Sequence, residues 1–262
     1  MDPVTTSVRD QRRIVASVAL AGAVLILVVL LQRGGVERRS ACRSTLIPAY
    51  LPATEIARLV DGAARPRLVI MNPANGPGAD AHPDFRAAVR SAHAAGGRVL
   101  GYVPTGYGAR PAADVTADID RYRSWYGVDG VFLDEAAHDP AHLSYYAALA
   151  EHARTDRMRV VVVNPGVVPA RGYFDVADVV VTFEGAYADY AAARASAPDW
   201  YAGIDRQRIA HLIYGASRAQ ALAAVREVDV GYLYVTSGTL PDPWHALPSY
   251  LHDEERALEA CA

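Results

Sequence analysis

Residues 98–134 read RVLGYVPTGYGARPAADVTADIDRYRSWYGVDGVFLD and contain the clearest indication of the architecture. The stretch begins with an apolar run, Arg98–Val103, passes through an amphipathic segment, 112–125, and ends on a second apolar run, Gly130–Asp134. Both runs are nearly continuous in apolar residues, which is typical of strands that are covered on both faces. A strand, a helix and a second such strand predict one βα unit of a parallel sheet.

The same alternation recurs along the chain. Further strands are expected at Leu46–Tyr50, Leu68–Asn72, Arg159–Asn164, Val179–Glu184, Ile209–Tyr214 and Tyr232–Thr236, with helical segments at 82–95, 140–153 and 216–227. The connection before Val179 is short, and we expect it to lack a full helix. Eight units of this kind predict an α/β fold, a (β/α)8 TIM barrel over residues 45–262.

A doubly wound α/β sheet is the alternative fold. It usually carries a Gly-rich phosphate loop after its first strand. Here the first strand continues as IPAYLPATE (residues 47–55), which contains no glycine. The barrel is therefore the favoured prediction.

An apolar segment precedes the barrel. Residues 14–31, IVASVALAGAVLILVVLL, carry no charge, and as a helix they would span about 27 Å, close to the thickness of a bilayer core. We expect a cytoplasmic N-terminus (1–13), one transmembrane anchor (14–31), a linker (32–44) and a barrel outside the cytoplasm, in a single-pass protein of the cell membrane. Arginines flank the segment on both sides, so charge does not decide the orientation. The alternative is secretion after signal cleavage, but the run exceeds the usual signal h-region and no A-x-A site follows it.

The two cysteines, Cys42 and Cys261, bracket everything after the anchor. In a (β/α)8 barrel the chain enters the first strand and leaves the last helix at the same end. We therefore expect a disulfide that closes the barrel, worth roughly 5 kcal/mol on the chain-entropy estimate. Such a bond would place the domain in an oxidising compartment. Two unpaired thiols are the alternative.

Composition excludes several classes of protein. The net charge is −3 at pH 7, so no nucleic-acid partner is expected. All 26 basic residues are arginine, and the lack of lysine excludes Schiff-base enzymes, pyridoxal-phosphate enzymes and P-loop proteins. The eight histidines show no metal-binding spacing, and we expect neither a metal nor another cofactor. The sequence leaves the oligomeric state open.

Three acids follow predicted strands directly. They are Asp134 and Glu135 in VFLDE and Glu184 in VVVTFE. A carboxylate at the end of a buried strand is costly to desolvate unless it is paired or used, and function collects at the C-terminal ends of barrel strands. Two or three acids without lysine, nucleophilic cysteine or metal ligands are typical of glycoside hydrolysis. Structural acids that cap loops or pair with arginine are the alternative.

The three acids must meet two physical conditions to share a catalytic centre. Adjacent strand residues point to opposite faces, so Asp134 and Glu135 can both reach the mouth only if the strand ends or bulges between them. One acid should also have a raised pKa, since a general acid holds its proton near neutral pH.

Polar and aromatic side chains accompany the acids at the predicted strand ends. Flat rings with a polar tip suit a sugar groove, although ordinary half-buried tyrosines at a barrel rim would give the same pattern. The candidate substrate-binding residues are Tyr50, Asn72, Tyr102, Tyr107, Asn164, Tyr187 and Tyr214.

The order of these motifs resembles one family. IPAY, MNPANGPG, GYVPTGYG, DGVFLDE, NPG and TFEG follow one another at successive strand ends, and this pattern is similar to that of the spherulin-type (spherulation-specific) glycoside hydrolases from about Thr45 to Leu258. The resemblance implies a (β/α)8 barrel and endo-α-1,4-N-acetylgalactosaminidase activity on a galactosamine-containing exopolysaccharide. It maps the family's acids onto Asp134, Glu135 and Glu184.

The sequence therefore predicts an endo-acting glycoside hydrolase, with an amino-sugar polysaccharide as substrate. In one mechanism an acid of the Asp134–Glu135 pair protonates the leaving oxygen and the opposite acid is the nucleophile. In the other, a substrate N-acetyl group attacks and a carboxylate orients it. The chief alternative function is a non-catalytic, membrane-anchored protein that binds carbohydrate or organises a matrix. A deacetylase or lyase would lack metal ligands or a lysine base.

Overall fold

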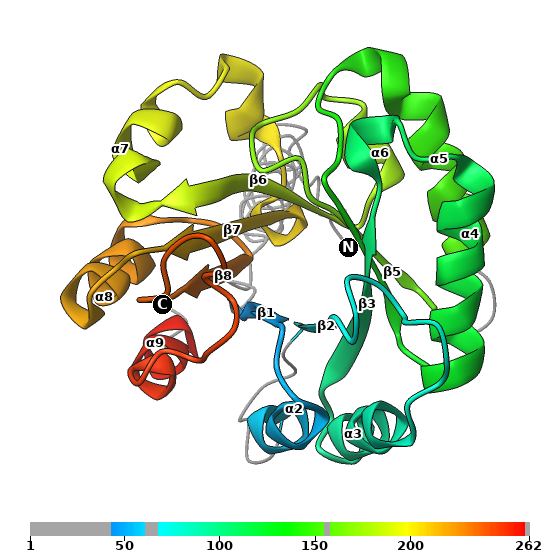
Figure 1. Ribbon diagram of the computed structural model, residues 1–262. Coiled ribbons are helices and arrows are strands. Elements are labelled where there is room, and N and C mark those ends of the chain that lie inside the picture. Colours follow the sequence, from blue (N-terminus) through cyan, green and yellow to red (C-terminus); the bar gives the residue numbers. More distant parts are fainter. Residues whose placement is uncertain (1–42, 61–67, 155–157, 260–262) are drawn as a thin grey trace, which may run out of the picture. The chain divides into compact units, whose positions relative to one another are not determined.

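The computed structural model describes residues 43–60, 68–154 and 158–259, which form an eight-stranded sheet ringed by helices (Figure 1). Each strand pairs in parallel with the next along the chain. The predicted (β/α)8 barrel is thus confirmed. The strands are β1 (Leu46–Ala49), β2 (Leu68–Met71), β3 (Arg98–Pro104), β4 (Gly130–Asp134), β5 (Val160–Val163), β6 (Val179–Ala186), β7 (Ile209–Tyr214) and β8 (Tyr232–Val235).

The helices surround this sheet and cover its outer face (Figure 1). The connection between β5 and β6 holds a single four-residue helix, as its short length predicted. A capping box of Ser217 and Gln220 begins the helix before β8, because the two side chains satisfy the first free amides. The α-helices are α2 (Ala53–Val60), α3 (Pro83–Ala94), α4 (Ala112–Arg121), α5 (Leu143–Ala153), α6 (Tyr173–Val176), α7 (Tyr187–Ala195), α8 (Arg218–Glu227) and α9 (Leu251–Glu259).

Short helical turns complete the connections. A π-helical turn, η2 (Tyr122–Tyr126), prolongs α4, and the 3-10 turns are η1 (Gly106–Gly108), η3 (Pro140–His142), η4 (Asp199–Gly203) and η5 (Arg206–Arg208). The Tyr122 ring lies where a side chain at Gly101 would be, with 2.4 Å between the nearest ring atom and an ideal Cβ. A glycine in β3 therefore lets this turn pack directly on the sheet.

The seam between β1 and β8 closes differently from the other strand pairs. Where β1 and β8 begin, Ser44 N–H donates to Gly231 O (2.9 Å), and Leu233 N–H donates to Ser44 O (3.1 Å). At the C-terminal end of β8, the Val235 N–H donates to the Glu254 carboxyl of α9 (3.0 Å). A glutamate side chain thus takes the place of a strand partner, because a buried amide needs an acceptor.

Glu254 should make stability depend on pH. The residue is fully buried, and burial raises its pKa well above the ordinary 4.5. Its stabilising contribution is therefore complete below about pH 4.5 and is lost as pH rises through the folded-state pKa. Glu254→Gln keeps an acceptor for Val235 without ionising. We expect its melting temperature to fall less than that of the wild type between pH 5 and 8, and to be at least about 3 °C higher at pH 8.

The exposed Glu151 of α5 supplies the matched control. Glu151→Gln should leave the pH dependence of the melting temperature as in the wild type. Equal pH dependence in the Glu254→Gln variant and the wild type would refute this role for Glu254.

Two predictions lie outside the described residues, namely the anchor at 14–31 and the Cys42–Cys261 disulfide. Among the helices that the structure describes, none has the length and apolar character needed to cross a membrane. Next to the first cysteine, Arg43 donates hydrogen bonds to the carbonyls of Val225 (2.5 Å) and Val228 (2.8 Å), at the end of α8. The C-terminal helix α9 packs against the same α8. The disulfide stays a prediction.

Candidate active site

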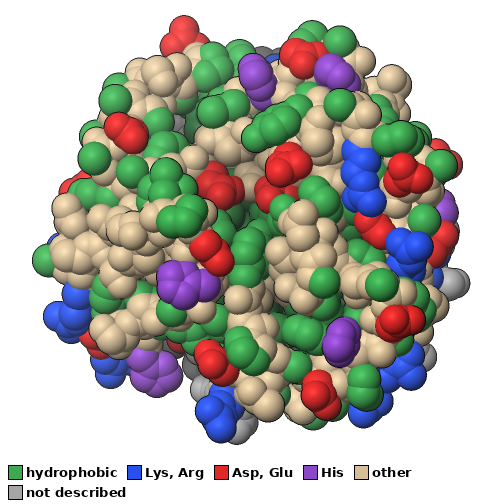
Figure 2. Space-filling model, viewed as in Figure 1, with side chains coloured by type: hydrophobic (Ala, Val, Ile, Leu, Met, Phe, Trp, Pro, Cys, Tyr) green, Lys and Arg blue, Asp and Glu red, His purple; other side chains and the backbone are tan. Residues whose placement is uncertain are grey.

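The polar strand ends gather at one mouth of the barrel. The strand registers place Tyr50, Asn72, Tyr102, Asp134, Asn164, Glu184, Tyr214 and Thr236 at or just beyond the strand ends, on the face that points inward. Figure 2 shows acidic side chains around a hollow at the centre of the face in view. The structure thus brings these strand-end residues together at one end of the barrel.

Asn164 joins two of the three acids. Its side-chain amide nitrogen donates to Asp134 Oδ1 (2.6 Å) and also to Glu184 Oε2. Because both oxygens lie within hydrogen-bond distance of one nitrogen, they are at most about 5 Å apart. The Asp134 carboxyl also accepts a hydrogen bond from the Tyr102 hydroxyl. Residues of β3, β4 and β6 and the end of β5 therefore form one hydrogen-bonded group.

Aromatic side chains border this group. The Tyr50 and Tyr102 rings meet edge to face at 5.4 Å between centroids. The indole of Trp244, in the loop after β8, donates to the Glu184 carboxyl. Trp244 is buried and its ring contacts Tyr214 at 6.2 Å between centroids. The acids are therefore set between aromatic walls, which limit their access to water.

The surroundings change the acidity of both joined acids. Loss of hydration, followed by repulsion from Asp134, raises the pKa of Glu184 to about 7, against opposing hydrogen bonds from Asn164 and Trp244. Loss of hydration also raises the pKa of Asp134, and hydrogen bonds from the Glu135 amide, Asn164 and Tyr102 oppose that rise. Two carboxyls this close cannot both ionise freely. The pair can thus hold one proton near neutral pH, as a general acid requires.

The irregularity expected between Asp134 and Glu135 is present. β4 ends at Asp134, and Glu135 has a positive φ of 49°, in the left-handed region. Asp134 faces Asn164, whereas Glu135 is exposed. The change of backbone conformation between the two residues carries Glu135 out of the regular strand alternation.

A second irregularity brings Glu184 to the mouth. In the β6–β7 register Val181 pairs with Ala210 and Phe183 with His211, which leaves Thr182 as an extra, bulged residue. With regular alternation after Val181, which faces inward, Glu184 would point outward. The bulge reverses this, and Glu184 pairs with inward-facing Leu212.

A buried polar cluster holds the bulge on the helix side of β6. His211 accepts or donates at both ring nitrogens, with Thr182 Oγ1 at 3.0 Å and the Tyr190 hydroxyl at 2.7 Å. Burial lowers the pKa of His211 to about 3, so this ring is neutral. The Thr182 hydroxyl also bonds to Tyr201 at 2.6 Å. These contacts satisfy the polar groups of the bulge away from the mouth.

Other predicted site residues lie further from the joined acids. The Asn72 side-chain oxygen accepts from Gly76 N–H (2.9 Å) and so braces its own loop. Tyr107 is 66% exposed and contacts Glu135 through the backbone, its N–H donating to Glu135 O (2.6 Å). Tyr187 begins α7 and packs, half-buried, against the core. Among the described residues, no three His, Cys, Asp or Glu side chains are arranged to hold a metal ion.

The sequence did not reveal two residues that contact the acids. Trp244 lies nine residues past the end of β8, and no periodicity relates a long loop to a strand end. Thr105 bonds to the backbone of Asp134 and Glu135. A signal for its loop was available, because the glycines on both sides of Tyr107 indicate positive φ angles.

Comparisons with known proteins agree with this architecture. The family described as "Spherulation-specific family 4" matches residues 54–258. Spherulin-4 of Physarum polycephalum is 34% identical over 233 residues, which are 82% of this chain and 70% of the relative.

Two solved structures share the fold. The crystal structure of Aspergillus clavatus Sph3 in complex with GalNAc has a TM-score of 0.73 at 21% identity and covers 85% of this chain and 100% of its own. A maltogenic α-amylase, AmyB of Thermotoga neapolitana, has a TM-score of 0.51 at 10% identity, with coverages of 86% and 76%. The family match and the identity to Spherulin-4 show that this chain belongs to spherulation-specific family 4.

Proposed function

We propose that this chain is an endo-acting glycoside hydrolase that cleaves a polysaccharide containing N-acetylgalactosamine or galactosamine. The observation that carries the proposal is the Asp134–Glu184 pair, whose carboxyls share the Asn164 amide, while loss of hydration and mutual repulsion raise the pKa of Glu184 to about 7. Glycosidic bond cleavage commonly uses two such carboxyls, a protonated one as general acid and an ionised one as nucleophile or base.

The raised pKa supports Glu184 as the general acid. The mechanism predicted from the sequence takes the proton from the Asp134–Glu135 pair. The loss of hydration that raises the pKa of Glu184 favours Glu184 as the source of this proton instead. Glu184 gives its proton to the leaving glycosidic oxygen as the bond to the anomeric carbon breaks. Asp134 then either attacks that carbon or orients a substrate N-acetyl group that does so, and water completes the hydrolysis.

Both routes imply the same stereochemistry. Each route consists of two successive substitutions at the anomeric carbon, and each substitution inverts its configuration. The product should therefore keep the configuration of the substrate. Carboxyl oxygens at most about 5 Å apart also fit retaining enzymes better than inverting ones, whose carboxyls lie about 6.5–9.5 Å apart to admit a water.

The substrate class rests on the family and on one shared fold. Sph3 was crystallised with GalNAc, and the rings of Tyr50, Tyr102 and Tyr214 at the mouth of this chain are of the kind on which a sugar stacks. An anchored barrel outside the cytoplasm, closed by a Cys42–Cys261 disulfide, would place the enzyme where it meets such a polymer. Secretion after cleavage of residues 14–31 would serve the same end.

The test is incubation of the full chain with α-1,4-linked N-acetylgalactosamine oligosaccharides and their partly deacetylated forms. We expect internal cleavage, seen as shorter oligosaccharides by mass spectrometry, with retained configuration in the first product by NMR. Binding without cleavage would instead support the non-catalytic carbohydrate-binding alternative. The proposal would be overturned if the chain neither bound nor cleaved any amino-sugar polymer.

A further inference from the structure

Glu135 occupies a backbone conformation that the chain must hold in place. Its φ of 49° is unusual for a residue with a side chain, and such conformations persist only where the surroundings fix them. Because this conformation separates the directions of Asp134 and Glu135, whatever fixes it also fixes where the exposed carboxylate of Glu135 lies.

One buried hydroxyl bonds to both acid residues through their backbone. Thr105 is fully buried, and its hydroxyl donates to Asp134 O and to Glu135 O, each at 2.8 Å. The Thr105 N–H donates to the same Asp134 O at 2.9 Å. A side chain from the end of the neighbouring strand therefore binds the carbonyls of both residues in the turn that carries the acids.

The direction of each hydrogen bond in this network follows from counting protons. Ala137 N–H donates to the Tyr146 hydroxyl oxygen at 2.8 Å. The single Thr105 proton is engaged by the two carbonyls, so the Tyr146 hydroxyl donates to Thr105 Oγ1 at 2.9 Å. The network runs from the amide after the acid turn, through Tyr146 and Thr105, back to the carbonyl of Glu135.

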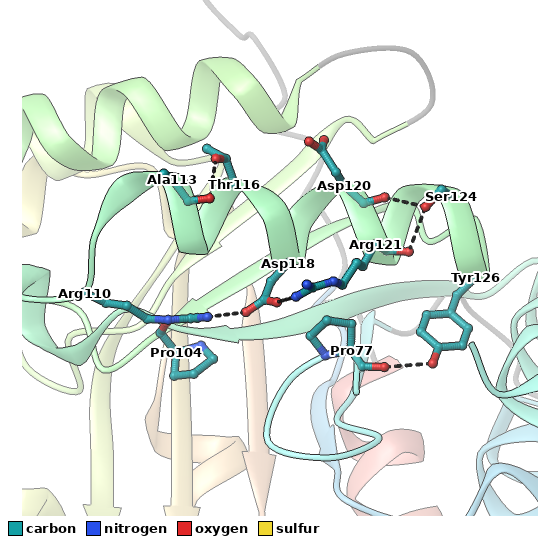
Figure 3. Close-up of polar contacts among 10 residues, drawn as sticks. All are labelled: Pro77, Pro104, Arg110, Ala113, Thr116, Asp118, Asp120, Arg121, Ser124 and Tyr126. Atoms are coloured by element: carbon teal, nitrogen blue, oxygen red, sulfur yellow. Dashed lines mark hydrogen bonds and ion pairs between the residues drawn. The ribbon is translucent and has the colours of Figure 1, made fainter. Parts of the chain in front are cut away.

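The loop that carries Thr105 is itself firmly held, as Figure 3 shows. Arg110 donates to Pro104 O (3.0 Å) at the end of β3 and to Asp118 Oδ2 (2.5 Å) on α4. Asp118 is buried and takes a second ion pair from Arg121 at 2.7 Å. The Thr105 hydroxyl is therefore presented by a braced loop rather than by one free to follow the acid turn.

We infer that Thr105 is a positioning residue for Glu135, and this rests on the proposed glycoside hydrolase function. Together with the Tyr107 N–H, which donates to the same Glu135 carbonyl, the Thr105 hydroxyl holds the left-handed conformation of Glu135. It thereby sets the carboxylate of Glu135 against a substrate held by the Asp134–Glu184 pair. Thr105 is too deeply buried to touch the substrate itself. Its influence on the reaction passes through the backbone of the acid turn.

The test compares Thr105→Val with Thr105→Ser. Valine keeps the shape and removes the donor, whereas serine keeps the donor and removes a methyl group. For Thr105→Val we expect kcat to fall about 10- to 100-fold with KM within about twofold of the wild type, because small displacements of a reacting group cost rate rather than binding. Thr105→Ser should recover most of this loss. Assays are made well below each variant's melting temperature.

A double-mutant cycle separates positioning from a general structural effect. If Thr105 acts through Glu135, Thr105→Val should change the residual activity of a Glu135→Gln enzyme by less than about threefold. The same 10- to 100-fold loss in both backgrounds, or equal activity of Thr105→Val and wild type, would overturn the inference. An inactive wild type would instead count against the proposed function, so the two failures are distinguishable.

Discussion

Glu184→Gln should lower kcat by about 10³-fold or more at pH 6, with the fold intact. The variant keeps the acceptor for the Trp244 indole and the size of the side chain, but it cannot deliver a proton to the leaving oxygen. Positioned acid–base groups commonly contribute about 10²–10⁴-fold to a rate. Glu135→Gln should cause a comparable loss if its exposed carboxylate acts on the same substrate. The measurement is initial-rate hydrolysis, with circular dichroism to establish folding.

Glu254→Gln is the matched control for these variants. Glu254 is a fully buried glutamate away from the mouth, and its carboxyl bonds to Val235 at the β1–β8 seam, so its replacement should leave kcat within about twofold. Near-normal activity in Glu184→Gln would remove that residue from the mechanism. Near-normal activity in Glu135→Gln would do the same for Glu135, and would leave Thr105 with nothing catalytic to position.

The barrel was predictable because its signals are local and repeated. Runs such as Val160–Val163 are apolar throughout, since both faces of a parallel strand are covered. The four-residue α6 was also foreseen from the length of its connection. Strand ends were less certain: the predicted strands included Tyr50 and Asn72, which lie one residue past the ends of β1 and β2.

The site was predictable only in part, because its geometry depends on departures from regular structure. Asp134, Asn164 and Glu184 could be identified as strand-end residues, and the break between Asp134 and Glu135 follows from strand alternation. The bulge at Thr182 could not, since VVVTFE reads equally well as a regular strand. The contact of Trp244 with Glu184 depends on the path of a long loop, for which the sequence has no periodic signal.

Asn164→Leu should lower kcat by about 100-fold and move the basic limb of its pH profile upward. In the wild type, activity should fall as pH rises through about 7, where Glu184 loses its proton. The hydrogen bond from Asn164 lowers the pKa values of both Glu184 and Asp134. Without it both pKa values rise, so the proton on Glu184 persists to higher pH while the two carboxyls lose the group that fixes their separation.

Asn72→Leu is the control that makes this result specific. Asn72 is also an asparagine just past a barrel strand, but its side-chain oxygen binds Gly76 N–H within its own loop. Its replacement can weaken that loop and raise KM, yet it removes no donor from either carboxyl, so the basic limb should stay where it is in the wild type. An unmoved limb in Asn164→Leu would mean that Glu184 does not carry the proton whose loss ends activity. A limb that moved equally in both variants would mean that it reports the shape of the mouth rather than the shared amide.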